Sequence, residues 1–180
     1  LAERVHALPL KPETLIETVA NTLTLPAKAL RMIDRIEACQ PHGGSRGLGW
    51  LLASKRIDPQ EWFFKAHFYQ DPVCPGSLGL ESFLQLLKVI AVQRWQGGAA
   101  SVLETVAVGM PHSWNYRGQV IPDNDKVLVE AVVTAVDEAQ KLLRADGYLS
   151  VDGKVIYPVE KPYKPTGGLR VLGGNLSPDA

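Results

Sequence analysis

The chain has 180 residues, of which 46% are hydrophobic and 21% are charged. These values are typical of a globular protein with one domain of ordinary size, and they argue against an intrinsically disordered chain. The 19 basic and 19 acidic residues balance, no basic cluster indicates nucleic-acid binding, and no apolar stretch is long enough to span a membrane.

The N-terminal part of the chain predicts a linker and a short helix, followed by two strands. In residues 1–25 and directly after them, Pro9, Pro12 and Pro26 punctuate the sequence, and the apolar residues between Pro12 and Pro26 repeat with helical spacing. We expect a strand over residues 30–36, a turn over residues 41–45 and a second strand over residues 47–57. Residues 58–61 predict a helical turn, because an aspartate stands at the cap position and a proline at the first helical position.

Residues 77–95 predict the longest helix of the chain. Ser77 is a suitable cap, and Gly97-Gly98 ends the helical pattern. The apolar residues recur with helical spacing and form a wide face. The members of this face are Leu80, Phe83, Leu84, Leu87, Ile90 and Ala91.

Strands follow this helix. Residues 126–136 are rich in β-branched side chains, and residues 142–151 and 154–159 flank the hairpin signal Asp152-Gly153. One apolar helix with several antiparallel strands predicts an α+β fold, in which a curved sheet encloses the helix. Residues 26–163 make up this domain, and the proline- and glycine-rich residues 164–180 predict a C-terminal linker.

The strongest functional signal lies just before the long helix. His67 stands among aromatic residues, and the stretch Asp71-Pro-Val-Cys-Pro-Gly76 leads into the helix. The prolines stiffen this connection, and Gly76 allows the backbone to approach a ligand closely. The first N–H groups of a helix have no internal acceptor, and the helix dipole is positive there. This end of the helix therefore suits a carbonyl oxygen that gains negative charge.

Glu81 and Gln85 lie four residues apart, so both project from one face of the helix. A carboxylate on an otherwise apolar helix is costly unless it is paired or has a function. The residues suit a β-elimination, in which neutral His67 removes the α-proton of a thioester and the Gly76 N–H stabilises the carbonyl oxygen. Glu81 then protonates the departing 3-hydroxyl group, and Gln85 holds the Glu81 carboxyl group in place.

Other residues of the segment are candidates for substrate contact or for structure. Val73 and Ser77 lie in the same stretch as Gly76 and are further candidates for substrate binding. Cys74 is either a reactive thiol near the helix N-terminus or a small buried wall residue. Cys74 and Cys39 form no CxxC pair, so we expect neither a disulfide framework nor a structural zinc site. The expected environment is reduced and cytoplasmic. The proposed chemistry requires no metal ion and no organic cofactor.

Each functional signal also has a purely structural interpretation. A histidine between aromatic residues, such as His67, is often a hydrogen-bonded core residue. Glu81 is also compatible with a solvated charge that favours the helix dipole in the first turn. His6 and His112 are expected at the surface, and Arg117 is either a surface charge or a contact for a phosphopantetheine arm.

Several short motifs occur in order between residues 26 and 162, and together they resemble a known family. They are Arg31-Met-Ile-Asp-Arg-Ile36, Trp62-Phe-Phe, His67-Phe68, Asp71-Pro-Val, Pro75-Gly76, Leu78-Gly-Leu80, Arg117-Gly-Gln-Val120 with Pro122, Ala145-Asp-Gly147 and Val151-Asp-Gly-Lys154 with Ile156-Tyr157. This set resembles the FabA-like 3-hydroxyacyl-[acyl-carrier-protein] dehydratases, most closely the dehydratase domains of polyunsaturated fatty acid synthases.

The resemblance implies a hotdog fold, with His67 and Glu81 as the catalytic pair, Gly76 as the oxyanion-binding amide and Gln85 as the supporting residue. It also implies that the histidine and the carboxylate come from different subunits of a dimer, formed by two copies or by a tandem sister domain. The substrate would be carried on the phosphopantetheine of an acyl carrier protein. Isomerising relatives have aspartate at the position of Glu81 and tend to have cysteine at that of Ser77, whereas purely dehydrating relatives have glutamate, so the resemblance does not predict isomerisation.

The expected function is dehydration of a 3-hydroxyacyl thioester to a trans-2-enoyl thioester in fatty acid, polyunsaturated fatty acid or polyketide synthesis. Two alternatives remain open: a non-catalytic hotdog scaffold that pairs with a sister domain, and a hotdog thioesterase. Some hotdog thioesterases carry a His-Gly-Gly sequence at the start of the helix. In this chain His42-Gly43-Gly44 lies far before the predicted helix, which favours its interpretation as a turn.

Overall fold

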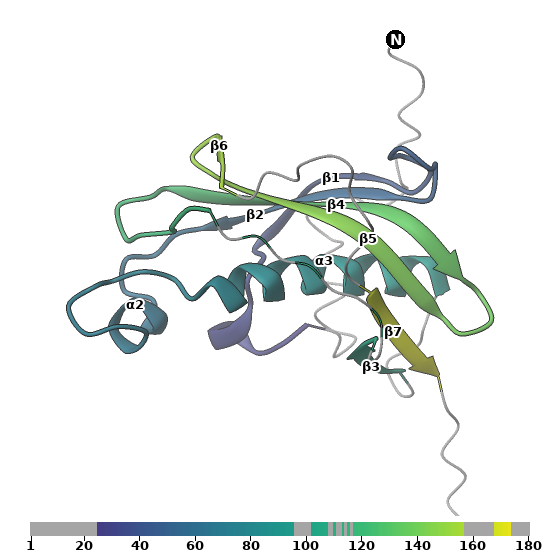
Figure 1. The fold of residues 1–180 in the computed structure, drawn as a ribbon, viewed down its shortest axis with the longest axis horizontal. Helices are drawn as coiled ribbons and strands as arrows, with labels where there is room; N and C mark the ends of the chain where they lie inside the picture. Colours follow the sequence, from purple (N-terminus) through teal and green to yellow (C-terminus); the bar gives the residue numbers. More distant parts are fainter. Residues whose placement is uncertain are drawn as a thin grey trace, which may run out of the picture.

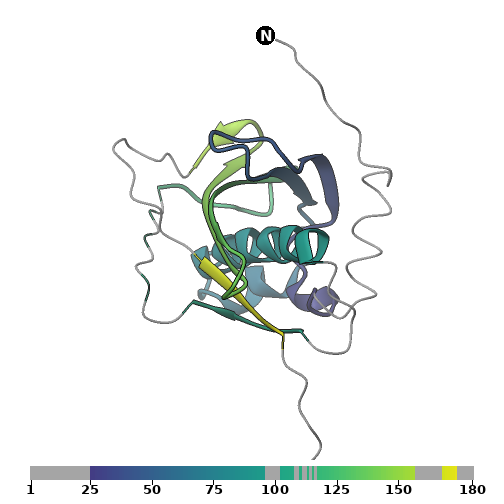
Figure 2. The same ribbon diagram turned by 90° about the vertical axis from the view of Figure 1, so that its right-hand side faces the viewer.

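Helix α3 (Gly76–Trp95) lies across the inner face of a curved antiparallel sheet (Figure 1). The computed structural model describes residues 25–95, 102–107, 110, 113, 115, 117–156 and 168–173. Viewed nearly along the helix, the sheet curls around it (Figure 2). The α+β architecture predicted from the sequence is therefore confirmed.

The strands of the described residues form one antiparallel sheet in the order β1-β2-β4-β5-β7-β3, and β6 pairs with β5. Along β4 buried and half-buried residues alternate, because successive side chains of a strand point to opposite faces. The strands are β1 (Arg35–Gln40), β2 (Trp50–Arg56), β3 (Val102–Val106), β4 (Lys126–Asp137), β5 (Leu142–Val151), β6 (Lys154–Val155) and β7 (Gly168–Gly173).

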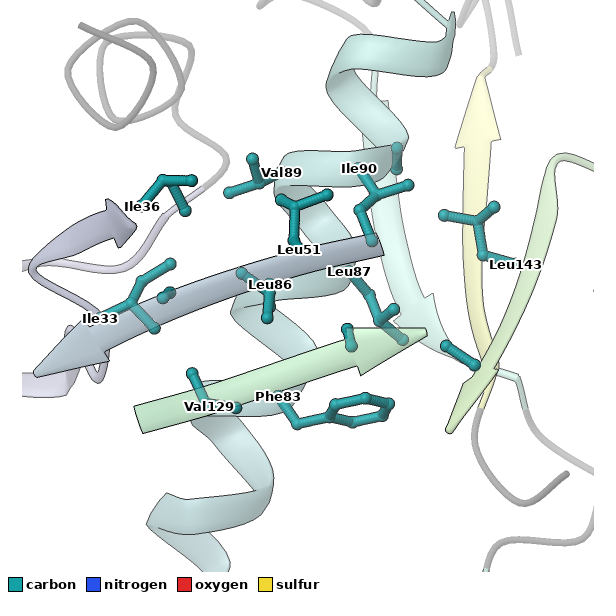
Figure 3. Packing of buried hydrophobic residues seen from close by; sticks show 14 of the residues in the cluster. Ile33, Ile36, Leu51, Phe83, Leu86, Leu87, Val89, Ile90, Val129 and Leu143 are labelled. Atoms are coloured by element: carbon teal, nitrogen blue, oxygen red, sulfur yellow. The ribbon is translucent and has the colours of Figure 1, made fainter. Parts of the chain in front are cut away.

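The main core lies between α3 and the sheet (Figure 3). Leu86 and Leu87 of α3 are fully buried, and they belong to the same cluster as Leu51 of β2 and Val129 of β4. Burial of side chains of this size stabilises the fold by about 1.5–3 kcal/mol each. The helix is thus held by apolar contact along most of its length.

Gly147 of β5 permits close packing between the sheet and α3. A Cβ atom at this position would lie 2.4 Å from two ring atoms of Phe83 on the helix, well inside van der Waals contact. Only a residue without a side chain fits there. Gly147 is the glycine of the motif Ala145-Asp-Gly147, so this packing explains why the motif ends in glycine.

A second apolar cluster holds the short helix α2 (Trp62–Ala66) against one end of the sheet. Phe63 and Phe64 are buried and contact each other edge to face, with ring centroids 4.7 Å apart. Met32 and Leu149 belong to the same cluster. Because α2 precedes His67 directly, this cluster positions the histidine.

The predicted strand over residues 30–36 is wrong. Residues Lys28–Leu30 form the 3-10 helix η1 and the strand β1 begins at Arg35. The reason lies in the tertiary structure: the backbone N–H of Met32 donates to the side chain of Gln85, 53 residues away, instead of joining a strand ladder. The second predicted strand is confirmed over Trp50–Arg56, and the turn before it is confirmed as well.

The predicted helical turn over residues 58–61 is an Asx turn, in which the Asp58 carboxylate accepts a hydrogen bond from the backbone N–H of Gln60. The helix itself starts only at Trp62, and its cap residue Glu61 makes no side-chain cap bond. Ser77 is not the cap of α3 either, because this helix already begins at Gly76.

The predictions for the C-terminal half are largely confirmed. β4 and β5 match the predicted strands to within one residue, and the turn Asp152-Gly153 has φ values of 48° and 81°, as a hairpin turn of this kind requires. The predicted linker over residues 164–180 needs correction, because Gly168–Gly173 form β7, between β5 and β3. The predicted N-terminal helix, His6 and His112 lie outside the described residues.

In the part of the chain that the structure describes, no helix is both long and apolar enough to cross a membrane. Among the same residues no group of His, Cys, Asp and Glu side chains has the geometry of a metal site.

Candidate active site

His67 lies at the C-terminal end of α2 and is half-buried. Its backbone N–H closes the last turn of the helix by donating to the carbonyl oxygen of Phe63, at 3.1 Å. Phe68, the next residue, stacks on the imidazole at a tilt of 32°, with ring centroids 3.9 Å apart. The imidazole is therefore held both by its backbone and by a neighbouring ring.

The orientation of the His67 imidazole defines which nitrogen can act as a base. Its Nδ1 lies 3.1 Å from the carbonyl oxygen of Val73. A carbonyl oxygen only accepts hydrogen bonds, so Nδ1 carries the proton and the neutral ring has its lone pair on Nε2. Within the described residues Nε2 has no hydrogen-bond partner. The ring is thus in the tautomer that a general base needs.

The Val73 carbonyl is itself held in position. The backbone N–H of Val73 donates to the carbonyl of Asp71, and that of Cys74 donates to the carbonyl of Val120, both at 2.9 Å. The chain reverses between His67 and Val73 at Gln70, which has a φ of 57°. The side chain of Val73 is buried and its carbonyl orients His67, while its predicted contact with substrate stays a prediction.

Gly76 is the first residue of α3, which is the position that an oxyanion-binding amide requires. The N–H of a first helical residue has no acceptor within its own helix, and the positive end of the helix dipole lies there. The hydrogen bond from Leu78 N–H to the Pro75 carbonyl forms the first turn just behind it. Ser77 follows on the exposed side of the helix.

Glu81 and Gln85 form a hydrogen-bonded pair on α3. Gln85 Nε2 donates to Glu81 Oε1 at 2.9 Å and to the carbonyl oxygen of Leu30 at 2.8 Å. Gln85 Oε1 accepts the backbone N–H of Met32, also at 2.8 Å. The two backbone partners fix the orientation of the amide group, because one is a donor and the other an acceptor. Gln85 is fully buried and presents an N–H to the carboxylate of the half-buried Glu81.

The site residues therefore form two groups, and no direct interaction between the two groups occurs among the residues that the structure describes. His67 and Val73 precede α3 and Gly76 begins it, while Glu81 and Gln85 lie in its second and third turns. Within the described residues no hydrogen bond or ion pair links His67 to Glu81.

One face of α3 is only partly covered by the residues that the structure describes. Leu80 is 36% exposed, and the neighbouring residues of this stripe are half-buried or exposed. Leu80 belongs to the predicted apolar face of the helix, but it lies at the exposed edge of that face. The stripe comprises Ser77, Leu80, Glu81, Leu84 and Lys88. Phe68 and Tyr69, beside His67, are also exposed, at 53% and 90%.

A small apolar cavity of about 30 Å³ lies beside the N-terminal end of α3. Cys74 lines it and is buried, which confirms its interpretation as a wall residue. Burial raises the pKa of this thiol to about 12, so it is not a reactive thiolate. The other lining residues are Met32, Lys55, Ile57, Phe63, Pro75, Leu78, Gly79, Ser82, Val120, Val127 and Leu149.

Three participants in the site were not predicted from the sequence. The backbone groups of Leu30 and Met32 orient Gln85, and the carbonyl of Val73 orients His67. The motif Arg31-Met-Ile-Asp-Arg-Ile36 contains Met32 and follows Leu30 directly, but only the fold shows that Gln85 is the partner of both residues. His42 lies exposed in the turn between β1 and β2, as predicted, and not at the start of α3.

Comparison with known proteins finds a family whose model matches most of this chain. A model of the FabA-like domain matches residues 25–160. One polypeptide of the polyunsaturated fatty acid synthase of Thraustochytrium sp. is 39% identical over 143 residues, which cover 77% of this chain and 9% of that polypeptide. The chain thus corresponds to a small part of this much longer relative.

Solved structures with low sequence identity share the fold. The dehydratase heterocomplex ApeI:P of Xenorhabdus doucetiae matches with a TM-score of 0.56 at 15% identity, covering 88% of this chain and 91% of that chain. A mutant of thioesterase PA1618 of Pseudomonas aeruginosa matches with a TM-score of 0.53 at 13% identity, covering 92% and 96%. These matches confirm the predicted hotdog fold, and at this identity they show the fold alone.

Proposed function

The chain belongs to the FabA-like domain family, and on this premise we propose that it dehydrates a 3-hydroxyacyl thioester to a trans-2-enoyl thioester. The family match and the similarity to a polyunsaturated fatty acid synthase support a dehydratase role. One observation carries the finer proposal. The Val73 carbonyl holds His67 as the tautomer with a free Nε2, a few residues before the Gly76 amide at the start of α3.

The proposed reaction begins at the α-carbon of the substrate. His67 Nε2 takes the α-proton, and the electron pair of the broken C–H bond moves toward the thioester carbonyl, whose oxygen gains negative charge. The N–H of Gly76 donates to that oxygen, and the positive helix end stabilises the charge further. Such a preorganised donor acts mainly on the transition state, because the charge is largest there.

The second half of the reaction expels the hydroxyl group. The electron pair returns to form the double bond between C2 and C3, the C3–O bond breaks, and protonated Glu81 supplies the proton that makes the leaving group water. His67 then carries one additional proton and Glu81 lacks one. Transfer of this proton back to Glu81 restores the site, so the net products are the enoyl thioester and water.

The proposal requires a second hotdog unit. The uncovered stripe of α3 that carries Glu81 and the exposed Phe68 and Tyr69 beside His67 are surfaces that a partner can bury. We propose that a second copy or a tandem sister domain packs there and brings its own histidine to Glu81. The acyl group would arrive on the phosphopantetheine of an acyl carrier protein, in fatty acid, polyunsaturated fatty acid or polyketide synthesis.

The decisive experiment supplies the purified domain with a 3-hydroxyacyl pantetheine thioester. Formation of the conjugated enoyl thioester, followed by its ultraviolet absorbance and by mass spectrometry, is the expected result. Release of free thiol without the enoyl product would instead identify a thioesterase. A domain that is folded and paired with a second hotdog unit but yields neither product would be the non-catalytic scaffold.

A further inference from the structure

Lys55 is an unusual residue for its position in β2. It follows Leu51 and Ala53 in the row of β2 side chains that face the interior, and it is 9% exposed. A buried ammonium group is costly unless it is paired. Lys55 Nζ lies 3.0 Å from Glu61 Oε1 and 3.8 Å from Asp34 Oδ1. The side chain is therefore satisfied, but it occupies a place that an aliphatic residue would fill at lower cost.

The surroundings of Lys55 indicate why its shape matters. It lines the apolar cavity beside α3, and it also lines a larger polar groove of about 570 Å³ on the other side. Glu61 and Asp34, which bind its ammonium group, line the groove and not the cavity. The aliphatic part of Lys55 thus faces the cavity while its charge faces the groove, as long cationic side chains commonly do.

Ile57 is the second residue that lines both spaces. It is 8% exposed and belongs to the apolar cluster around α2. Lys55 and Ile57 together form a thin partition between an apolar cavity and a polar groove. On the other side the cavity borders Pro75, the residue directly before Gly76.

We propose that the Lys55–Ile57 partition limits the length of the acyl chain that the site accepts. This inference rests on the proposed function, because it takes the cavity next to the Gly76 amide as the place where the end of the acyl chain lies. The cavity is small and almost wholly apolar, so it suits a terminal methyl group and not a polar end. A longer chain would collide with the aliphatic stem of Lys55, which lines the cavity.

Removal of the partition should relax this limit rather than raise affinity in general. Lys55→Ala shortens the stem and joins the cavity to the groove, so additional carbons of a longer chain gain a path. The groove is open and lined mostly by charged residues, so these carbons remain partly in water and contribute little binding. The expected effect is a ratio of kcat/KM for longer over shorter substrates that rises by about tenfold or more.

Three variants test the proposal against a purely structural role of the ion pair. Lys55→Met keeps an unbranched stem of similar length but loses the charge, so it should retain the wild-type preference. Ile57→Ala thins the partition without changing any charge, so it should shift the preference as Lys55→Ala does. Lys65→Ala, which removes an exposed lysine of α2 that does not line the cavity, is the control and should leave the preference unchanged. Thermal unfolding of each variant verifies that it is folded.

The measurement uses a ladder of 3-hydroxyacyl pantetheine chain lengths in two forms, the thioester for turnover and the non-reacting amide for calorimetric binding. A shift toward longer chains in Lys55→Ala and Ile57→Ala, with none in Lys55→Met, supports the partition. Equal chain-length profiles in all folded variants overturn it and leave the dehydration intact. A shift in all three variants also overturns it, because the charge would then be decisive. If binding of the amides depended on chain length but no variant turned over the thioesters, the dehydratase function would be contradicted and the proposed role of the partition would be supported.

Discussion

Gln85 Nε2 donates a hydrogen bond of 2.9 Å to Glu81 Oε1 from a side chain that is fully buried. The same amide bridges the backbone N–H of Met32 and the backbone carbonyl of Leu30. One side chain therefore links the start of the domain to the proposed acid. Stability and catalysis are coupled at Gln85, whereas Glu81 is bound to it at one oxygen only.

We predict that Gln85→Met lowers both stability and activity. Methionine has a similar length but leaves the buried Met32 N–H without a partner, which costs about 1–3 kcal/mol, and it also removes the part-buried hydrogen bond to the Leu30 carbonyl, which contributes about 1 kcal/mol. The free energy of unfolding should therefore fall by about 2–4 kcal/mol. Urea unfolding followed by circular dichroism measures this change. A loss below the error of that measurement would show that the three hydrogen bonds are not important for the fold.

Glu81→Gln should separate the two effects. The substituted amide still offers an oxygen to Gln85 Nε2 but no longer supplies a proton with the ease of a carboxylic acid. We expect stability to change by less than about 1 kcal/mol while kcat falls by about 10²–10⁴-fold. Steady-state kinetics on the 3-hydroxyacyl thioester measures the second quantity. Near-normal turnover would exclude Glu81 as the acid.

His67→Asn tests the proposed base. The asparagine side chain keeps a group that can donate to the Val73 carbonyl, so the turn before α3 should persist, but it offers no basic nitrogen. We expect kcat to fall by about 10²–10⁴-fold with little change in unfolding temperature. Exchange of the substrate α-proton with deuterated solvent is a second readout, and it should disappear with turnover. Retained exchange would point to another base.

The sequence predicted α3 to within one residue and β5 at both ends. These elements are determined locally: α3 by apolar periodicity between a Pro-Gly start and a Gly-Gly stop, and β5 by its hairpin turn. The site residues His67, Gly76, Glu81 and Gln85 were also predicted, because their spacing is local and matches a family. In the structure the Val73 carbonyl orients His67, Gly76 begins α3, and Gln85 donates a hydrogen bond to Glu81. The chemical roles of these residues remain predictions.

The features that were missed depend on contacts between distant parts of the chain. Met32 is excluded from a strand because Gln85 takes its N–H, and no local pattern reveals a partner 53 residues away. Helix α2 has only five residues, so it owes its existence to the burial of Phe63 and Phe64 rather than to helix propensity. The bond from His67 to Val73 needs the positive φ of Gln70, which is uncommon for a residue other than glycine.

The raised pKa values of the two cysteine thiols predict how the stability of the fold depends on pH. Burial raises the pKa of Cys39 to about 11 and that of Cys74 to about 12, from an ordinary value of 9.0. The folded state retains the thiol protons to higher pH than the unfolded state, so their stabilising contribution is complete below pH 9 and is lost as the pH rises toward these values. Denaturant unfolding at pH 8 and at pH 10 should therefore show a decline, and Cys74→Ala should make the decline smaller. An unchanged decline would assign it to other groups.

Leu80→Asp tests whether the uncovered stripe of α3 faces a second hotdog unit. Leu80 is 36% exposed in the single chain, so the aspartate disturbs the monomer little, but it would place an unpaired charge in an apolar interface. We expect the dimer to weaken by at least about tenfold, since a buried unpaired charge costs several kcal/mol, and turnover to fall in parallel. Val155→Asp, at a site that is 51% exposed on β6, is the matched control and should change neither quantity. Sedimentation over a range of concentrations, run beside the activity assay, measures both. If Leu80→Asp remained a fully active dimer, the partner would have to approach another face, and the completion of the Glu81 site by a second subunit would be wrong.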